Sequence, residues 1–424
     1  DNSNFRGYKI QGTFTDNIGN YGEWNTYVFA VISNNKINKL EFSSEFTYQN
    51  NKKIFFQGYR GQGSDEDAGV GKSILIAGDK ELQALIDTKC TYSIKFFNES
   101  TFGVNKCKFD EDWKDGSLIP FGNIELSPAA CVLNYGQGVF EGTKSFRTKK
   151  NNIILFRPDM NAKRIKHSSK RLCIPEMSET FFLKSVFKTV KDNIDYIPPL
   201  GKGSLYIRPV IWGTSPILGV GPAEEYTFLI YVCPVGPYFK KGIKPLDLII
   251  TTEFHRAAPK GIGNAKAIGN YSASLLPVIE AKKRGYDEVI YLDASNDSII
   301  EEVGSANIFI VKDNILKTPQ LNGSILPGIT RDSVIKIASD LLKMRVEETN
   351  VSLTDLLNAD EVFCVGTAVV VTPVGSVTHK TKKFLFNNGR MGDCTMRLRE
   401  KLIKIQKQEI QDPFGWIYDL KDNL

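Results

Sequence analysis

The sequence lacks long apolar runs and lacks blocks of like charge. Its apolar stretches, such as residues 367–374, are far shorter than the roughly 20 residues that a membrane-spanning helix needs, so no membrane insertion is expected. The formal net charge is only +6, from 54 Lys and Arg against 48 Asp and Glu that are spread along the chain. Without a basic arm or stripe, nucleic acid is not an expected partner. The 42% of hydrophobic and 24% of charged residues are instead typical of a soluble globular protein.

The seven cysteines form no C-x-x-C pair. Their scatter argues against a zinc ribbon and against a disulfide scaffold, and it suits a reducing compartment. The chain opens at Asp1 and not at Met, so any targeting peptide is out of view. We therefore expect no metal site and a cytoplasmic or mitochondrial location.

Length and residue patterning predict several domains. A chain of 424 residues exceeds what one hydrophobic core usually supports. Residues 1–97 predict a small β-rich module, because six short segments rich in β-branched and aromatic residues alternate with polar turns. From residue 98 onward, strands alternate with amphipathic helices, and a Pro/Gly-rich stretch around residues 236–246 predicts an interdomain linker. The predicted fold class is α/β (α+β), preceded by the β-rich module.

The stretch from Arg256 to Tyr271 carries the strongest chemical signal. Lys266 lies in it among small and apolar residues, which lower the pKa of a lysine by disfavouring the ammonium form and so yield a nucleophilic amine. Glycines on both sides let a bulky planar group approach the backbone, and Tyr271 supplies a hydroxyl. Taken alone, a lysine in a Gly-rich loop is more often a solvated loop residue.

Three further segments offer groups that bind an anion or hold a cation. Thr330 is a predicted N-cap of a helix over residues 330–344, whose free N–H groups would face an anion. Glu302 stands directly before an apolar strand, where its carboxylate could keep a pyridine nitrogen protonated. Thr367 and Ala368 follow another apolar strand and offer backbone N–H groups and a hydroxyl. Each segment alone has an ordinary explanation: a capped helix, a solvated acid and a common turn.

In this order and spacing the motifs resemble the branched-chain aminotransferases, which are pyridoxal-phosphate enzymes of fold type IV. The resemblance begins near Phe102, covers about three quarters of the chain, includes the closing Phe414-Gly-Trp416, and leaves residues 1–97 unexplained. The other matching segments are Leu133-Asn-Tyr135-Gly-Gln-Gly-Val-Phe140-Glu-Gly142, Leu155-Phe-Arg-Pro-Asp-Met-Asn161-Ala-Lys-Arg164, Ser169-Lys-Arg-Leu-Cys-Ile-Pro175 and Leu205-Tyr206-Ile-Arg208-Pro209.

The resemblance implies that pyridoxal 5′-phosphate is the cofactor. Lys266 would hold it as a Schiff base and act as the catalytic residue, and Tyr271 would contact its phenolic oxygen. Glu302 would pair with the pyridinium nitrogen, because a protonated ring is the better electron sink. The phosphate would be bound by an arginine, two amides at a helix start and a threonine. This set is Arg164, Ile329, Thr330 and Thr367.

The resemblance also implies the reaction. Leucine, isoleucine and valine would exchange their amino group with 2-oxoglutarate, and Lys266 would move the proton between the substrate Cα and the cofactor. Aromatic residues would line a pocket for the aliphatic side chain, Arg208 would help to accommodate a second carboxylate, and turn amides would bind the α-carboxylate. The matched substrate residues are Tyr135, Phe140, Tyr206, Arg208, Thr367 and Ala368. The chain departs from the family pattern at Ile268, where many members have glycine.

The family's organisation implies a small domain over residues 98–235, a linker over 236–246 and a large cofactor-binding domain over 247–424. It also implies a homodimer, because family members build the active site near a subunit interface.

Alternatives stay open on the sequence alone. A D-amino-acid aminotransferase or an aminodeoxychorismate lyase would keep the same lysine and acid, although the aromatic segments favour the branched-chain enzymes. A binding or scaffolding protein with a relic enzyme domain is a rival of another class. Residues 1–97 are either an interaction or regulatory domain, or an extension packed on the enzyme.

Overall fold

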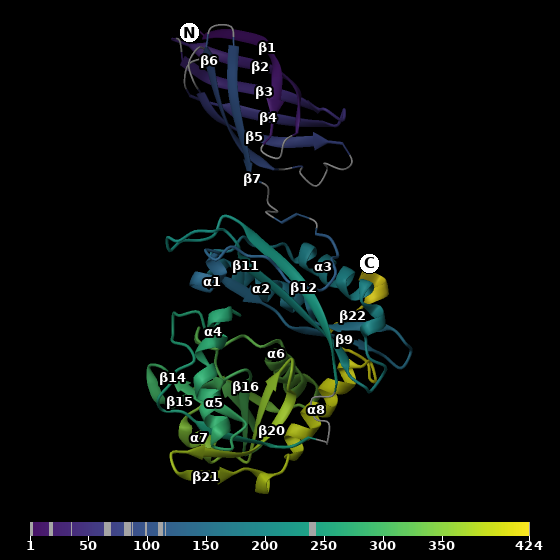
Figure 1. Ribbon diagram of the computed structural model, residues 1–424, viewed down its shortest axis with the longest axis vertical. Coiled ribbons are helices and arrows are strands. Elements are labelled where there is room, and N and C mark those ends of the chain that lie inside the picture. The colour runs from purple at the N-terminus through teal and green to yellow at the C-terminus, as the bar shows by residue number, and fades with distance from the viewer. Residues whose placement is uncertain are drawn as a thin grey trace. The chain divides into compact units, whose positions relative to one another are not determined.

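The computed structural model describes residues 3–16, 20–34, 36–62, 69–79, 86, 88–97, 100–108, 113–114, 116–236 and 243–423 (Figure 1). The chain divides into two compact units, Asp1–Asp112 and Trp113–Leu424. Most of the predicted linker, residues 237–242, lies outside the described residues.

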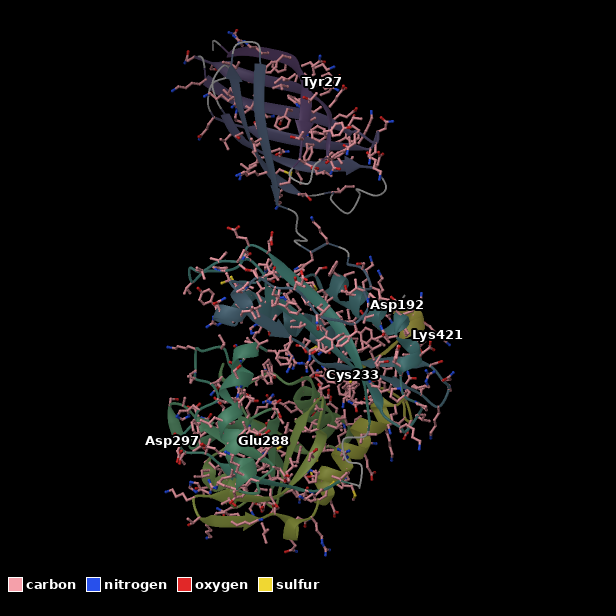
Figure 2. All side chains as sticks on the ribbon, in the orientation of Figure 1. Tyr27, Asp192, Cys233, Glu288, Asp297 and Lys421 are labelled. Atoms are coloured by element: carbon pink, nitrogen blue, oxygen red, sulfur yellow. A yellow bond between two sulfur atoms is a disulfide. The ribbon has the colours of Figure 1, made fainter. Side chains whose placement is uncertain are left out.

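The first unit is an antiparallel sheet whose seven strands pair in chain order. Alternation of residue type explains the strands: along β2, Val28 and Ala30 are buried, whereas Tyr27, which is marked in Figure 2, and Phe29 are exposed. The bounds are β1 Ser3–Thr15, β2 Tyr21–Ser33, β3 Lys36–Tyr48, β4 Lys53–Arg60, β5 Gly69–Gly78, β6 Lys89–Phe97 and β7 Ser100–Lys108. Six strands were predicted; β7 is a seventh and carries the β-rich part past residue 97.

The first unit also contains a disulfide. Cys90 of β6 and Cys107 of β7 are opposite each other in the strand register and are bonded. The scatter of cysteines predicted a reduced set, and this prediction is wrong for the pair, because antiparallel pairing brings together residues that are 17 positions apart. The other five cysteines are free.

The second unit begins with a six-stranded sheet in the order β12-β11-β9-β10-β22, with β8 beside β11. Two helices, α2 and α3, pack on it, and Phe182, Val186 and Val190 of α3 are buried at helical spacing. Its elements are α1 Cys131–Tyr135, β8 Gly138–Phe140, β9 Thr143–Arg147, β10 Ile153–Phe156, α2 Pro158–Arg171, α3 Glu179–Asp192, η2 Ile194–Tyr196, β11 Ser204–Gly213 and β12 Tyr226–Val235.

A nine-stranded mixed sheet follows, in the order β15-β14-β13-β20-β19-β16-β17-β18, with β21 beside β20. Its core holds buried aliphatic residues such as Leu248, Ile290 and Ile308. Its elements are β13 Leu246–Ile250, α4 Ile268–Ala273, α5 Leu275–Lys283, β14 Glu288–Asp293, β15 Asn296–Val303, β16 Asn307–Lys312, β17 Ile315–Pro319, α6 Ile329–Lys336, η3 Ile337–Leu341, β18 Arg345–Thr349, α7 Leu353–Leu357, β19 Glu361–Gly366, β20 Val370–His379, β21 Lys382–Leu385, η4 Asn387–Gly389 and α8 Asp393–Gln406.

The helix predicted over residues 330–344 differs at both ends. It begins at Ile329 with Gly328 as the N-cap residue, so the prediction that Thr330 caps it is wrong. Gly328 has an ordinary extended backbone, and a side chain at this position would collide with the Asn307 side chain. No side-chain cap hydrogen bond is made, so the first N–H groups of α6 are left for another partner. Beyond Lys336 the chain continues as the π-helical η3.

The chain end returns to the first of these two sheets. β22 Ile417–Asp419 pairs with β10, and η5 Leu420–Asn423 follows; Figure 1 shows the C-terminus beside α3. Trp416 packs edge-on against Phe156, with ring centroids 5.7 Å apart. Within the described ranges, no helix is both long and apolar enough to cross a membrane, and no group of three His, Cys, Asp or Glu side chains could hold a metal ion.

Candidate active site

Lys266 and Tyr271 lie where the chain enters α4. The Lys266 Nζ is 2.7 Å from the Tyr271 Oη. The Lys266 backbone N–H donates to the Ser168 hydroxyl at 2.9 Å, and the Lys266 carbonyl accepts from the Phe140 N–H at 3.1 Å. These two hydrogen bonds tie the Lys266 backbone to α2 and to β8, so the position of the lysine depends on both sheets of the second unit.

The surroundings of Lys266 lower the pKa of its amine to about 7. Burial is the main cause, and the guanidinium groups of Arg164 and Arg208 add to it by repelling the ammonium form. The Nζ lies 4.6 Å from the centre of the Phe140 ring. Burial also raises the pKa of Tyr271 to about 12, so this phenol stays protonated and can donate a hydrogen bond. Near neutral pH a large fraction of Lys266 is therefore the free, nucleophilic amine.

Glu302, near the end of β15, is a buried carboxylate held by several donors. It forms an ion pair with Arg256, accepts from the Asn307 side chain at 3.2 Å and accepts from the Leu326 N–H at 3.2 Å. Burial raises the pKa of Glu302 to about 7 in spite of the Arg256 charge, and Glu301 beside it raises the pKa further. A carboxylate in this state is stabilised by any further cation that reaches it.

Arg164 of α2 makes a bidentate ion pair with Glu141, which is fully buried. The Arg164 Nε and Nη2 lie 2.7 Å and 2.8 Å from the two carboxylate oxygens, and Asn161 donates to Glu141 at 2.7 Å. The third nitrogen of the Arg164 guanidinium, Nη1, donates to the Pro327 carbonyl at 3.1 Å. The guanidinium is thereby fixed beside the loop that leads into α6.

The start of α6 and the Thr367 turn line one cavity of about 240 Å³. Ile329 and Thr330, both largely buried, contribute to its wall from α6, and Thr367 and Ala368 contribute from the turn between β19 and β20. The structure thus brings together three of the four predicted phosphate-binding residues, Ile329, Thr330 and Thr367, whereas Arg164 is not among the residues that line this cavity. Lys266 is not among the residues that line this cavity.

Three of the predicted substrate residues meet beside Lys266, and a fourth does not. The Arg208 guanidinium lies 4.7 Å from the Phe140 ring centre and donates to the Tyr206 hydroxyl at 2.8 Å. Phe140 also contacts the Tyr271 ring, with centroids 4.7 Å apart. Tyr135, by contrast, is 38% exposed at the end of α1, and its hydroxyl donates to the Leu218 carbonyl. No described contact links Tyr135 to Lys266.

Sequence reasoning missed the partners of the predicted residues. Arg256 binds Glu302, Glu141 holds Arg164 and accepts from Asn161, and Ser168 anchors Lys266. Arg256, Glu141 and Asn161 lie in segments that the family resemblance had already marked, whereas Ser168 lies between two of them, and only the fold shows which charge meets which. The sequence signal that could have revealed the partner of Arg164 was Glu141, an acidic residue between Phe140 and Gly142 in a matched segment.

The arrangement can form and break bonds to a planar carbonyl compound that carries an anionic group. It offers a neutral amine, a phenol donor, a buried carboxylate for a cationic ring nitrogen and a helix start for an anion.

Comparison with known proteins agrees with this geometry. The family model for class IV amino-transferases matches residues 138–377. A chloroplastic branched-chain-amino-acid aminotransferase of Arabidopsis thaliana is 51% identical over 318 residues, which are 75% of this chain and 77% of the relative. A mitochondrial branched-chain amino acid aminotransferase of Humulus lupulus is 45% identical over 336 residues, 79% and 82% of the two chains.

Two further likenesses bear on the site. A methionine aminotransferase of Arabidopsis thaliana is 42% identical over 328 residues, 77% of this chain and 92% of the relative. The crystal structure of the T.th. branched-chain amino acid aminotransferase with pyridoxamine 5′-phosphate superposes with a TM-score of 0.64 at 30% identity. This match covers 73% of this chain and 97% of that structure.

Proposed function

This chain belongs to the branched-chain amino acid aminotransferases of the class IV family, and we propose that Lys266, Tyr271 and Glu302 carry its reaction. It transfers the amino group of branched-chain amino acids to a 2-oxo acid, with pyridoxal 5′-phosphate as cofactor. The resemblance predicted from the sequence is confirmed. The readings as a D-amino-acid enzyme, a lyase or a relic domain are not retained, because relatives with half of their positions identical are branched-chain enzymes.

The chemistry of the site fits this cofactor. Glu302 is a buried carboxylate with a raised pKa, which a pyridinium nitrogen would stabilise, and the uncapped start of α6 at Ile329 and Thr330 suits a phosphate. Arg164 and Thr367 complete the proposed phosphate set. The bound cofactor supplies an electron sink for the carbanion at the substrate Cα.

In the proposed reaction Lys266 has two roles. Its amine, with a pKa lowered to about 7, would hold the cofactor between turnovers; once displaced by the substrate's amino group, it would take the proton from the substrate Cα and deliver it to the cofactor. Tyr271, 2.7 Å away, orients the amine, and its hydroxyl would donate to the phenolic oxygen of the bound cofactor. Phe140, Tyr206 and Arg208 surround the substrate side chain, and the amides of Thr367 and Ala368 bind its carboxylate. The Lys266–Tyr271 contact is the observation on which this assignment rests.

Substrate profiling tests the assignment. Leucine, isoleucine and valine are each expected to react with 2-oxoglutarate at a kcat/KM at least about tenfold above that of methionine, the size of preference that a shaped apolar pocket provides. D-Alanine is expected not to react, because the mirror-image carbon points its proton away from Lys266. Initial rates of glutamate formation measure all five. Methionine as the fastest substrate would place the chain with the methionine aminotransferase, and reaction with D-alanine alone would contradict the proposal.

We propose that the two sheets of the second unit are the small and large domains of the enzyme. The predicted division between residues 98–235 and 247–424 is supported by the two sheets and their separate cores, although residues up to Asp112 belong to the first unit and β22 joins the small-domain sheet from the C-terminal side. The active site then lies where the domains meet, since Lys266 comes from one and Ser168 from the other.

We propose that the first unit is an accessory module which the reaction does not need. It has cores of its own around Leu40 and Leu75, and the relatives match only 75–79% of the chain. Removing residues 1–112 is expected to change kcat by less than about twofold, in the range of effects from changes that touch no catalytic contact. Steady-state rates of the full and shortened chains compare them. A loss of folding or of most activity would show that the module is instead an essential packing element.

We also propose a homodimer. Apolar side chains are exposed together on α5, at Leu275, Leu276 and Ile279, and on the loop after β11, at Leu218 and Val220. Tyr135 donates to that loop at the Leu218 carbonyl and has no described contact with Lys266, as expected of a residue that completes the partner's site. Light scattering is expected to give twice the chain mass of 47.5 kDa. A monomer that retains full activity would contradict this.

For the compartment, we propose a plastid or a mitochondrion, because the named relatives are chloroplastic and mitochondrial; the sequence had predicted the cytoplasm or a mitochondrion. Immunoblots of purified organelles test this, and signal in the cytosolic fraction alone would contradict it.

A further inference from the structure

All the charged side chains that line the cavity at the α6 start and the Thr367 turn are positive. Its charged lining residues are Lys144 and Arg147 of β9 and Arg399 and Lys407 at α8, and no Asp or Glu is among the lining residues. The α8 side of the wall is formed at helical spacing by Arg399, Ile403, Gln406 and Lys407. One face of the last helix thus brings positive charge to the substrate-binding turn.

Two of these cations are close enough to repel each other. Burial and the nearby Arg399 charge lower the pKa of Lys144 to about 8, and burial lowers the pKa of Arg399. The Lys144 Nζ lies 3.4 Å from the Ala368 carbonyl, and the Arg399 Nη1 donates to the Val371 carbonyl. Over the described part of the chain, neither forms an ion pair with a carboxylate. Half-buried like charges are unfavourable unless an anion offsets them.

Of the two incoming substrates of the reaction, only one is an anion. A branched-chain amino acid is a zwitterion without net charge, whereas 2-oxoglutarate is a dianion. A positive wall raises the local concentration of an anionic ligand and its rate of association, and salt weakens both effects. The wall therefore distinguishes the two half-reactions by charge.

We propose that Arg399 and Lys407 form an entrance site for anionic 2-oxo acids, which draws the dicarboxylate amino acceptor toward the Thr367–Ala368 turn. The site acts on association and not on the proton transfer at Lys266. The inference rests on the transamination reaction, and it assigns a role to the last helix, which the proposed cofactor and substrate contacts do not use.

Single-turnover measurements on the holoenzyme separate the two halves. Leucine is mixed with the pyridoxal form and 2-oxoglutarate with the pyridoxamine form, each at low and high salt, for the wild type and for Arg399→Gln, Lys407→Gln and the double variant. The double variant is expected to lower kcat/KM for 2-oxoglutarate at least about tenfold at low salt, the lower end of electrostatic steering. The leucine half-reaction is expected to change less than about twofold, and the salt dependence of the 2-oxoglutarate half to flatten.

Matched controls keep the test decisive. Lys404→Gln removes a positive charge from the exposed side of α8, away from the cavity, and is expected to leave both halves unchanged. Arg399→Lys keeps the charge and is expected to restore most of the 2-oxoglutarate rate. Equal losses in both halves, or a full rate in the double variant, would overturn the entrance site. A wild type that is inactive with leucine as well would contradict the function itself.

Discussion

Replacement of Lys266 with alanine is expected to lower kcat for leucine and 2-oxoglutarate by at least about 10³-fold, because one side chain serves as cofactor anchor and as acid–base group. Lys266→Arg is expected to fail as well. Arginine keeps a positive charge, but it does not deprotonate near neutral pH and so cannot act as a neutral amine. Steady-state rates and borohydride trapping of the cofactor on the chain measure the loss. A colourless wild type without a trapped adduct would support a relic enzyme instead.

The control for this prediction is Lys282→Ala, an exposed lysine of α5, which is expected to retain full activity. The pH dependence gives a second check. With its pKa lowered to about 7, the neutral fraction of Lys266 in the apoprotein rises as the pH rises through 7, whereas an ordinary lysine becomes neutral only near its usual 10.5. Amine-labelling rates of Lys266 are therefore expected to reach half of their maximum near pH 7. A midpoint near 10 would mean that the surroundings do not activate this amine.

Local signals in the sequence were sufficient to find the reactive groups. Lys266 and Tyr271 are five positions apart, and the short helix α4 folds this spacing into direct contact. The residue pattern likewise placed Glu302 directly before an apolar strand, and in the structure it lies near the end of β15, shortly before β16. Such features depend on neighbours in the chain, which a single sequence displays.

Features that depend on distant contacts could not be predicted. The pairs Glu141–Arg164 and Arg256–Glu302 join residues 23 and 46 positions apart, and many acids and bases could have been paired in their place. Tyr135 had the right residue type, but its hydroxyl binds the Leu218 carbonyl and no described contact joins it to Lys266. The same reason hid the strand β7 and its disulfide, since strand pairing and not composition decides them.

Replacement of Glu302 with glutamine is expected to lower kcat by about 10²-fold or more, the size of effect seen when one preorganised electrostatic contact to the reacting system is removed. Glutamine keeps the shape and the hydrogen-bond acceptor but carries no charge to keep a ring nitrogen protonated. Glu280→Gln, at an exposed acid of α5, is the matched control and is expected to be silent. Kinetics and cofactor affinity measured by absorbance give the comparison, and a fully active Glu302→Gln variant would contradict the assignment.

The Glu302→Gln variant lowers activity, but it is expected to reduce the loss of stability that the apoprotein shows as the pH rises. Because burial raises the pKa of Glu302 from 4.5 to about 7, the folded chain keeps a proton between those values that the unfolded chain has lost. The stabilisation is complete below pH 4.5 and is lost as the pH rises through 7, by up to about 3 kcal/mol for this group.

The charged groups that act on Glu302, namely Arg256, Glu301 and Lys266, remain in the variant. Urea unfolding of both apoproteins at pH 5 and pH 8 is therefore expected to show a smaller loss of stability with pH in Glu302→Gln. The wild-type fold accepts an unfavourable buried charge near neutral pH, which a pyridinium nitrogen bound at Glu302 would offset. An identical pH dependence in the two proteins would mean that Glu302 is already stabilised by Arg256 alone.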